Sequence, residues 1–80
     1  MTNYACPCCN FKTLKEKPTG TFQICPVCYW EDDNVQFYDH NYQGGANELS
    51  LNEARENSKK YGVSDLKFKD LVRNANNDEK

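Results

Sequence analysis

The sequence predicts an α+β fold, in which a small zinc-ribbon-like β-hairpin module is followed by one or two short helices. Two Cys-Pro-x-Cys pairs, the first at Cys6 and the second at Cys25, are separated by fifteen residues. An alternating polar and apolar stretch lies between the pairs, and a helix-start signal appears at Ser50.

The cysteine pairs predict one tetrahedral metal site. A fifteen-residue connection is long enough to bring two tight turns onto a common ion. Four thiolates around zinc leave no open coordination position, so the ion is expected to be structural rather than catalytic. Zn²⁺ is the favoured ion, and Fe is the alternative because four thiolates suit either metal. The predicted ligands are Cys6, Cys9, Cys25 and Cys28.

The residue after the second cysteine of such a turn often needs a positive φ. Asn10 tolerates that conformation, whereas Tyr29 tolerates it less well. We therefore expect the second turn to be built differently from the first. Pro7 and Pro26 pre-set φ at matching positions of both turns, which indicates that the two pairs belong together.

Cys8 lies inside the first pair, where its side chain is expected to face away from the ion. Two interpretations stay open from the residues alone. In the first, Cys8 is a bystander thiol that a reducing compartment tolerates. In the second, it is either a reactive thiol beside the four ligands or a ligand that can exchange with Cys9.

The segment between the pairs predicts the β-hairpin. Residues 21–24 alternate polar and apolar side chains, and Pro18-Thr19-Gly20 before them indicates a turn. Together with residues 11–14, this stretch would form a hairpin that joins the two metal-binding turns.

The segment from Tyr29 to Tyr42 is both acidic and aromatic, and it is the best candidate for an interaction surface. Its carboxylates and its histidine could hold a second hard cation or perform acid–base chemistry. Alternatively, the aromatic rings cover the metal turns while the charges stay in water. The candidate interaction residues are Trp30, Glu31, Asp32, Asp33, Asp39 and His40.

Residues 50–53, Ser-Leu-Asn-Glu, predict a helix N-terminus with a capping box. Leu51, Ala54, Ser58 and Tyr61 follow at near-helical spacing, and Gly62 is expected to end the helix. Ser64 is then expected to cap a second, shorter helix with Phe68, Leu71 and Val72 on its inner side.

Composition predicts one metal-stapled domain over residues 1–73 and a flexible tail over 74–80. Leu, Ile, Val and Phe supply only fourteen of the 80 residues, so the core is small and a metal would be needed to hold it. The odd count of five cysteines, and a first segment unlike a secretory signal, favour a reducing cytoplasm. No stretch approaches the roughly 20 apolar residues that cross a bilayer, so no membrane partner is expected.

Several of these motifs occur together in a known family. Residues 6–9 (Cys-Pro-Cys-Cys), 25–28, 30–33 (Trp-Glu-Asp-Asp), 44–47 (Gly-Gly-Ala-Asn) and 50–55 resemble the bacterial cysteine-rich CPCC family. The resemblance runs from Tyr4 to Val72. It implies that Cys8 is part of a family hallmark, and that residues 44–47 and the Ser50 helix start pack near the metal turns. The family has no established activity, so the resemblance implies no function.

Three classes of function follow from the residues. The first is a non-enzymatic module that uses its acidic and aromatic residues to bind another protein. The second is a hydrolase-like enzyme that uses the acidic cluster with a second metal ion. The third is a nucleic-acid-binding zinc ribbon, which the net charge of −2 makes unfavourable although Lys12, Lys15 and Lys17 cluster. A glutaredoxin-like redox role for Cys25 and Cys28 is disfavoured. Residues 29–34 show no helical apolar period, and their three carboxylates would raise the pKa of a nearby thiol, whereas a redox thiol needs a lowered pKa.

Overall fold

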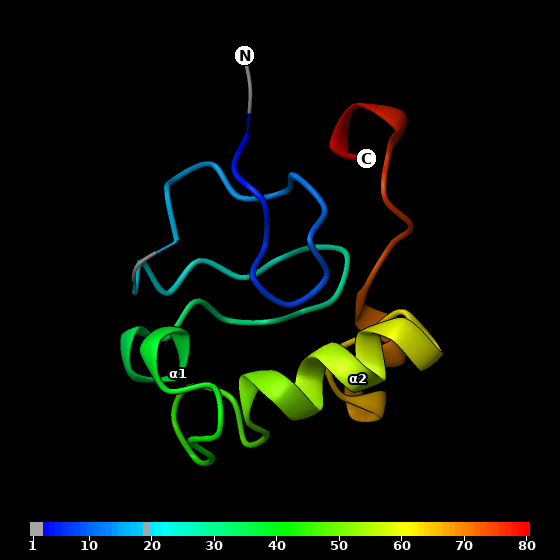
Figure 1. Cartoon of the computed structure of the whole chain (residues 1–80). Helices are drawn as coiled ribbons and strands as arrows, with labels where there is room; N and C mark the ends of the chain where they lie inside the picture. Colours follow the sequence, from blue (N-terminus) through cyan, green and yellow to red (C-terminus); the bar gives the residue numbers. More distant parts are fainter. Residues whose placement is uncertain (1–2, 19) are drawn as a thin grey trace.

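The computed structural model describes residues 3–18 and 20–80 (Figure 1). The part of the chain formed by residues 3–18 and 20–30 consists of turns and loops, drawn blue to cyan-green, which lie above the two α-helices in Figure 1. Two α-helices and two 3₁₀ helices follow it in the sequence. They are α1 (Asn34–Tyr38), α2 (Leu51–Tyr61), η1 (Leu66–Leu71) and η2 (Asn77–Glu79).

The predicted α+β class, with its zinc-ribbon-like β-hairpin, is wrong. Within residues 3–18 and 20–80 there is no strand, and β-type pairing is limited to two isolated antiparallel bridges, Tyr4–Leu14 and Ile24–Glu31. Each bridge closes the chain around one cysteine pair. The chain therefore pairs within each metal-binding turn, and not between residues 11–14 and 21–24 as the hairpin required.

The backbone of both segments explains why the hairpin does not form. The Thr13 N–H donates to the Phe11 carbonyl at 2.9 Å, which folds the first segment into a three-residue turn. Phe22, in the second segment, has a φ of 60°, far from the extended range that a strand needs. The turn predicted at residues 18–20 includes Thr19, which lies outside the described residues.

The core is small and lies between the cysteine pairs and α2. Leu14, Trp30 and Leu51 are its largest buried apolar side chains. The cysteines contribute a large share of the remaining apolar volume, because Cys6, Cys25 and Cys28 are fully buried. The interior thus depends on the arrangement of the sulfur atoms.

The predicted helix start at Ser50 is confirmed in α2. The Ser50 hydroxyl accepts from the Glu53 N–H at 3.1 Å, and the Glu53 carboxylate accepts from the Ser50 N–H at 3.0 Å. Gly62 ends the helix in the left-handed conformation, with a φ of 77°. Leu51 and Ala54 are buried, whereas the last residue of the predicted inner stripe, Tyr61, is 50% exposed.

The second predicted helix exists as η1, but its cap is different. The Asp65 carboxylate, and not Ser64, accepts from the backbone at the helix start, from Lys67 N–H at 3.2 Å. Ser64 is buried, and its N–H donates to the Cys28 carbonyl at 2.8 Å. Leu71, predicted to face inward, is 59% exposed.

The short helix α1 was not predicted. The Asp33 carboxylate accepts from the Gln36 N–H at 3.0 Å and so caps its N-terminus. The pair Asp33 and Gln36 has the spacing of a capping box, and this is the signal in the sequence that could have identified the helix.

Gln36 holds the loop that follows α1. Its side-chain amide donates to the carbonyls of Tyr42, Asn47 and Leu49, each at 3.0 Å, and the side chain is fully buried. Gly45 in this loop packs so closely that an added Cβ would lie 2.9 Å from an Asp33 oxygen. The side chain of Asn47 in turn bonds both backbone groups of Glu31. The loop of residues 44–47 therefore packs near the second cysteine pair.

Beyond η1 the chain runs back beside the cysteine turns, drawn orange to red in Figure 1. Here η2 begins after Asn76, and Glu79 is buried. The flexibility predicted for residues 74–80, and the domain end at residue 73, stay predictions to be tested by hydrogen exchange.

Candidate metal centre

The first cysteine turn is closed by two backbone hydrogen bonds. The Asn10 N–H donates to the Cys6 carbonyl at 2.8 Å, and the Cys6 N–H donates to the Phe11 carbonyl at 2.8 Å. Asn10 has a φ of 68°, as the sequence predicted for this position. The turn directs the side chains of Cys6 and Cys9 to the same side.

The second turn repeats this arrangement, so the expectation of a different construction is wrong. The Tyr29 N–H donates to the Cys25 carbonyl at 2.8 Å, and the Cys25 N–H donates to the Trp30 carbonyl at 2.9 Å. Tyr29 takes the same φ of 68° despite its bulk. Its ring packs on Phe68 with 4.5 Å between ring centroids, a contact that offsets the backbone strain.

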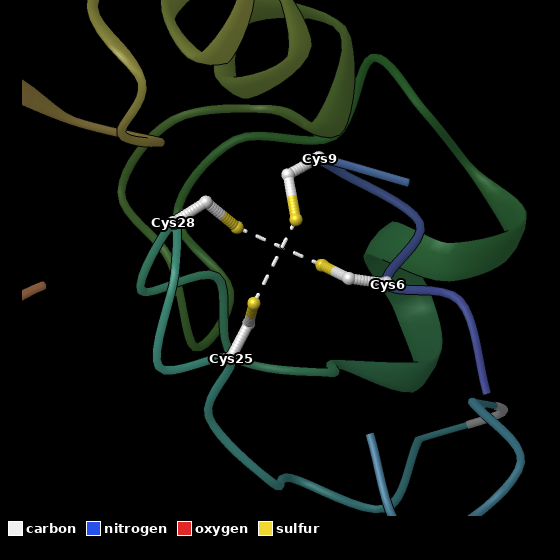
Figure 2. A group of neighbouring side chains, drawn as sticks. All are labelled: Cys6, Cys9, Cys25 and Cys28. Atoms are coloured by element: carbon white, nitrogen blue, oxygen red, sulfur yellow. Dashed lines mark hydrogen bonds between the residues drawn. The ribbon is translucent and has the colours of Figure 1, made fainter. Parts of the chain in front are cut away.

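The two turns bring four sulfur atoms to one point. All four Sγ atoms lie within 4.8 Å of one another, and Figure 2 shows them converging from the two turns. The Sγ atoms of Cys6 and Cys28 lie 3.6 Å apart, and those of Cys9 and Cys25 lie 3.7 Å apart. In Figure 2 the dashed lines that join these two pairs cross, as opposite edges of a tetrahedron do when seen in projection. A tetrahedral ion with metal–sulfur bonds of about 2.3 Å has sulfur–sulfur edges of about 3.8 Å. The four cysteines therefore fit a metal ion.

The electrostatics of the cluster also favour a cation. Hydrogen bonds from Cys28, Cys6 and Cys9, and from the Thr13 hydroxyl, lower the pKa of the Cys25 thiol. The charge held on Cys25 in turn raises the pKa of the other three thiols, mainly through their hydrogen bonds to Cys25. Without a cation, the mutual repulsion of neighbouring thiolates restricts how many of the four can be charged. A dication removes this restriction, because it stabilises all four in the charged form.

Two further groups bond to the sulfur atoms. The Thr13 hydroxyl lies 2.9 Å from the Cys25 Sγ, and the Cys8 N–H donates to the Cys6 Sγ at 3.4 Å. Thr13 is buried and was not predicted as part of the site. Its position depends on the turn at Phe11, which no local pattern indicated.

Cys8 does not join the four sulfur atoms. Its side chain is 7% exposed, and it lies beside an open cleft of about 450 Å³ between the first turn and α2. Arg55 of α2 spans this region, because its Nε donates to the Pro7 carbonyl at 2.8 Å. The reactivity predicted for Cys8 stays a prediction.

The carboxylates of the acidic and aromatic segment serve mainly to hold the backbone. One oxygen of Asp32 accepts from Gly20 N–H at 3.0 Å and from both the N–H and the hydroxyl of Thr21 at 2.9 Å. Asp33 accepts from Ala46 N–H at 2.9 Å in addition to capping α1. Burial alone would raise the pKa of Asp33, but these backbone N–H groups outweigh it and lower the pKa.

The structure separates the predicted interaction residues into two groups. Trp30, Asp32 and Asp33 are buried. Glu31 and His40 are half-buried, and Asp39 is exposed. Among residues 3–18 and 20–80, the cysteine cluster is the one group in which three or more His, Cys, Asp or Glu side chains lie close enough to hold an ion together.

His40 connects α1 to α2. Its Nε2 donates to the Phe37 carbonyl at 3.0 Å, and its Nδ1 accepts from the Arg55 Nη1 at 3.4 Å.

Comparison with known proteins identifies the family. The family model described as cysteine-rich CPCC matches residues 4–79, and the chain therefore belongs to this family. No curated protein matches the chain. In the described part of the chain, no helix has the length and apolar character needed to span a membrane.

Proposed function

We propose that this protein is a small cytoplasmic module, stabilised by one structural Zn²⁺ ion, that binds another protein. The observation that carries the metal assignment is the convergence of four cysteine sulfurs within 4.8 Å. Four thiolates complete a zinc coordination sphere, so the ion has no open position for substrate. All five cysteines are free thiols, which suits a reducing compartment.

Metal analysis of the purified native protein tests the metal assignment. We expect one zinc per chain and a colourless protein. A red protein with one iron per chain would replace zinc by iron, and a folded protein with no bound metal would reject the metal site.

The proposed interaction surface is the exposed part of the acidic and aromatic segment, which we call the α1 face: Tyr38, Asp39 and Tyr42. Tyr38 exposes 74% of its surface and Tyr42 exposes 43%. The Tyr42 N–H donates to the Asp39 carbonyl at 3.1 Å, which keeps these residues on one loop beside α1. Exposed tyrosines beside a carboxylate suit a partner that presents apolar and basic groups. Trp30, Asp32 and Asp33 would support this surface from the interior.

Site-specific photo-crosslinking in an extract of the source cells tests the surface. A crosslinker at Tyr38 should capture a defined partner, and Asp39→Asn should weaken that capture. A crosslinker at Tyr61, a tyrosine of α2 that is 50% exposed, is the matched control. Equal capture of the same protein from both positions would reject the α1 face.

A further inference from the structure

The last described segment of the chain is bonded to both cysteine turns. The Arg73 N–H donates to the carbonyl of Pro26, inside the second turn, at 3.1 Å. Six residues later, the Glu79 carbonyl accepts from the N–H of Lys12, just beyond the first turn, at 2.7 Å. We call residues 72–79 the C-terminal strap.

The two ends of the strap are joined by a bidentate ion pair. Arg73 Nη1 donates to Glu79 Oε1 and Nη2 donates to Oε2, both at 2.8 Å. The Asn76 N–H donates to the same carboxylate at 2.8 Å. Paired charges in this parallel geometry make stronger hydrogen bonds than neutral groups, and the Glu79 side chain is only 10% exposed. The pair closes residues 73–79 into a loop.

The middle of this loop lies against the buried core. Ala75 packs against the buried core that contains Cys6, Cys25 and Cys28. These three ligand residues are fully buried, so a chelator reaches their sulfur atoms only after a covering segment moves. Figure 1 shows the strap, in orange and red, beside the blue and green turns.

We propose that the C-terminal strap is a lid over the metal centre and that Arg73 and Glu79 are the positioning residues that keep it closed. The proposal rests on the metal site proposed above. Closing the strap slows the loss of the ion, because opening it requires the ion pair between Arg73 and Glu79 and both backbone hydrogen bonds to break. The strap thereby sets how long the ion stays bound, while the cysteines set how tightly it binds.

Zinc transfer to the chromogenic chelator 4-(2-pyridylazo)resorcinol tests the strap directly. Zinc-loaded wild type, Glu79→Gln and Arg73→Met should each start with one zinc per chain. Both variants should release zinc about tenfold faster, because a lost charged hydrogen bond shifts an opening equilibrium by roughly that factor. Arg73→Lys keeps the positive charge but loses the two parallel hydrogen bonds of the guanidinium group. Its rate of zinc release should lie between those of wild type and Arg73→Met.

Asp78→Asn is the matched control, since Asp78 belongs to η2 and is exposed. It should release zinc at the wild-type rate. Unchanged release from Glu79→Gln and Arg73→Met would overturn the proposal, and would point to entry beside half-buried Cys9. Equal acceleration by Asp78→Asn would overturn it as well, because net charge would then explain the effect. Wild type that binds no zinc would instead reject the metal site itself.

Hydrogen exchange gives a second measurement that does not depend on the variants' stability. In zinc-loaded wild type, the Lys12 and Arg73 amides should exchange more slowly than amides of exposed loop residues. Fast exchange at both amides would show an open strap, and would agree with the flexible tail that the sequence predicts.

Discussion

Tyr29 combines a strained backbone with a favourable ring contact. A left-handed conformation costs a residue with a Cβ atom roughly 1–2 kcal/mol, whereas Asn and Gly adopt it more easily. The stack on Phe68 is worth about 0.5–1.5 kcal/mol beyond the area that it buries. The cost of the backbone strain and the gain from the ring contact nearly cancel in the native protein. The strain can therefore be measured only when the ring contact is removed.

We therefore predict that the effect of Tyr29→Asn depends on Phe68. Alone, the substitution should change the free energy of unfolding by less than about 1 kcal/mol. In a Phe68→Ala background it should stabilise the zinc-loaded protein by about 1 kcal/mol, because only the strain is then relieved. Urea unfolding of the four proteins of this cycle measures the coupling. Equal effects in both backgrounds would contradict the assigned contact.

Gln36 satisfies several buried backbone groups at once. Replacing it with Leu would leave the carbonyls of Tyr42, Asn47 and Leu49 without their donor. We expect Gln36→Leu to lower the free energy of unfolding by about 3 kcal/mol or more. Glu56→Leu, at an exposed position of α2, should change it by less than about 0.5 kcal/mol. Similar losses in the two variants would show that the loop is not held by Gln36.

Residues whose role is set locally could be predicted from the sequence. The four ligand cysteines belong to two short turns, and proline and spacing fix each turn within four residues. Gln36 and Thr13 act on groups six to thirteen residues away along the chain. Their partners are brought together only by the finished fold, so no local pattern identified them.

At the scale of elements, α2 carries the clearest local signals. Its capping box joins Ser50 and Glu53 through two hydrogen bonds. We predict that Ser50→Ala lowers the free energy of unfolding by about 1 kcal/mol, as measured by urea titration in saturating zinc. Ser58→Ala within the same helix is the control, and it should cost less than about 0.5 kcal/mol. If Ser58→Ala cost as much as Ser50→Ala, the effect would not come from the cap.

The same local logic explains which elements were predicted and which were missed. The cap and the terminal glycine of α2 each act within one helical turn, so both ends of this helix could be predicted from the sequence. The prediction of a hairpin was wrong because the alternating pattern of residues 21–24 carries no information about the backbone angle φ. Phe22 adopts a positive φ, which a strand does not allow. Its backbone N–H donates to the Asp32 carbonyl at 2.8 Å, a contact with the far side of the second turn. This long-range contact outweighs the local preference for a strand.

At the scale of the whole molecule, the ion pair of the strap adds a pH dependence. Hydrogen bonds from Arg73, and then from the Asn76 N–H, lower the pKa of Glu79 to about 2 from an ordinary value of 4.5. A lowered folded-state pKa stabilises the protein above the unfolded value, and this stabilisation is lost as the pH falls through the folded value.

We therefore predict how Glu79→Gln compares with wild type as the pH changes. The difference in unfolding free energy should stay constant from about pH 7 to about pH 5.5 and shrink below about pH 4.5. Urea titrations in saturating zinc at each pH measure it. A difference in unfolding free energy that grows as the pH falls would contradict the lowered pKa of Glu79.

We expect the proposed metal centre to set the stability of the molecule as a whole. The apolar core is small, and three of its members are cysteines that are fully buried beside one another. Four thiolates and one dication add a charge of −2 to the −2 of the chain, which gives −4. Without the ion, the crowded thiols lose their common partner, and apparent zinc-binding energies in small modules are on the order of 10–16 kcal/mol.

Circular dichroism of the zinc-loaded protein during titration with EDTA tests this central claim most directly. Removal of the ion should abolish the helical signal of α2 in one step, and added zinc should restore it. The count of reactive thiols should rise at the same time from at most one, Cys8, to all five. A metal-free protein that keeps its helical signal and its protected cysteines would contradict the account.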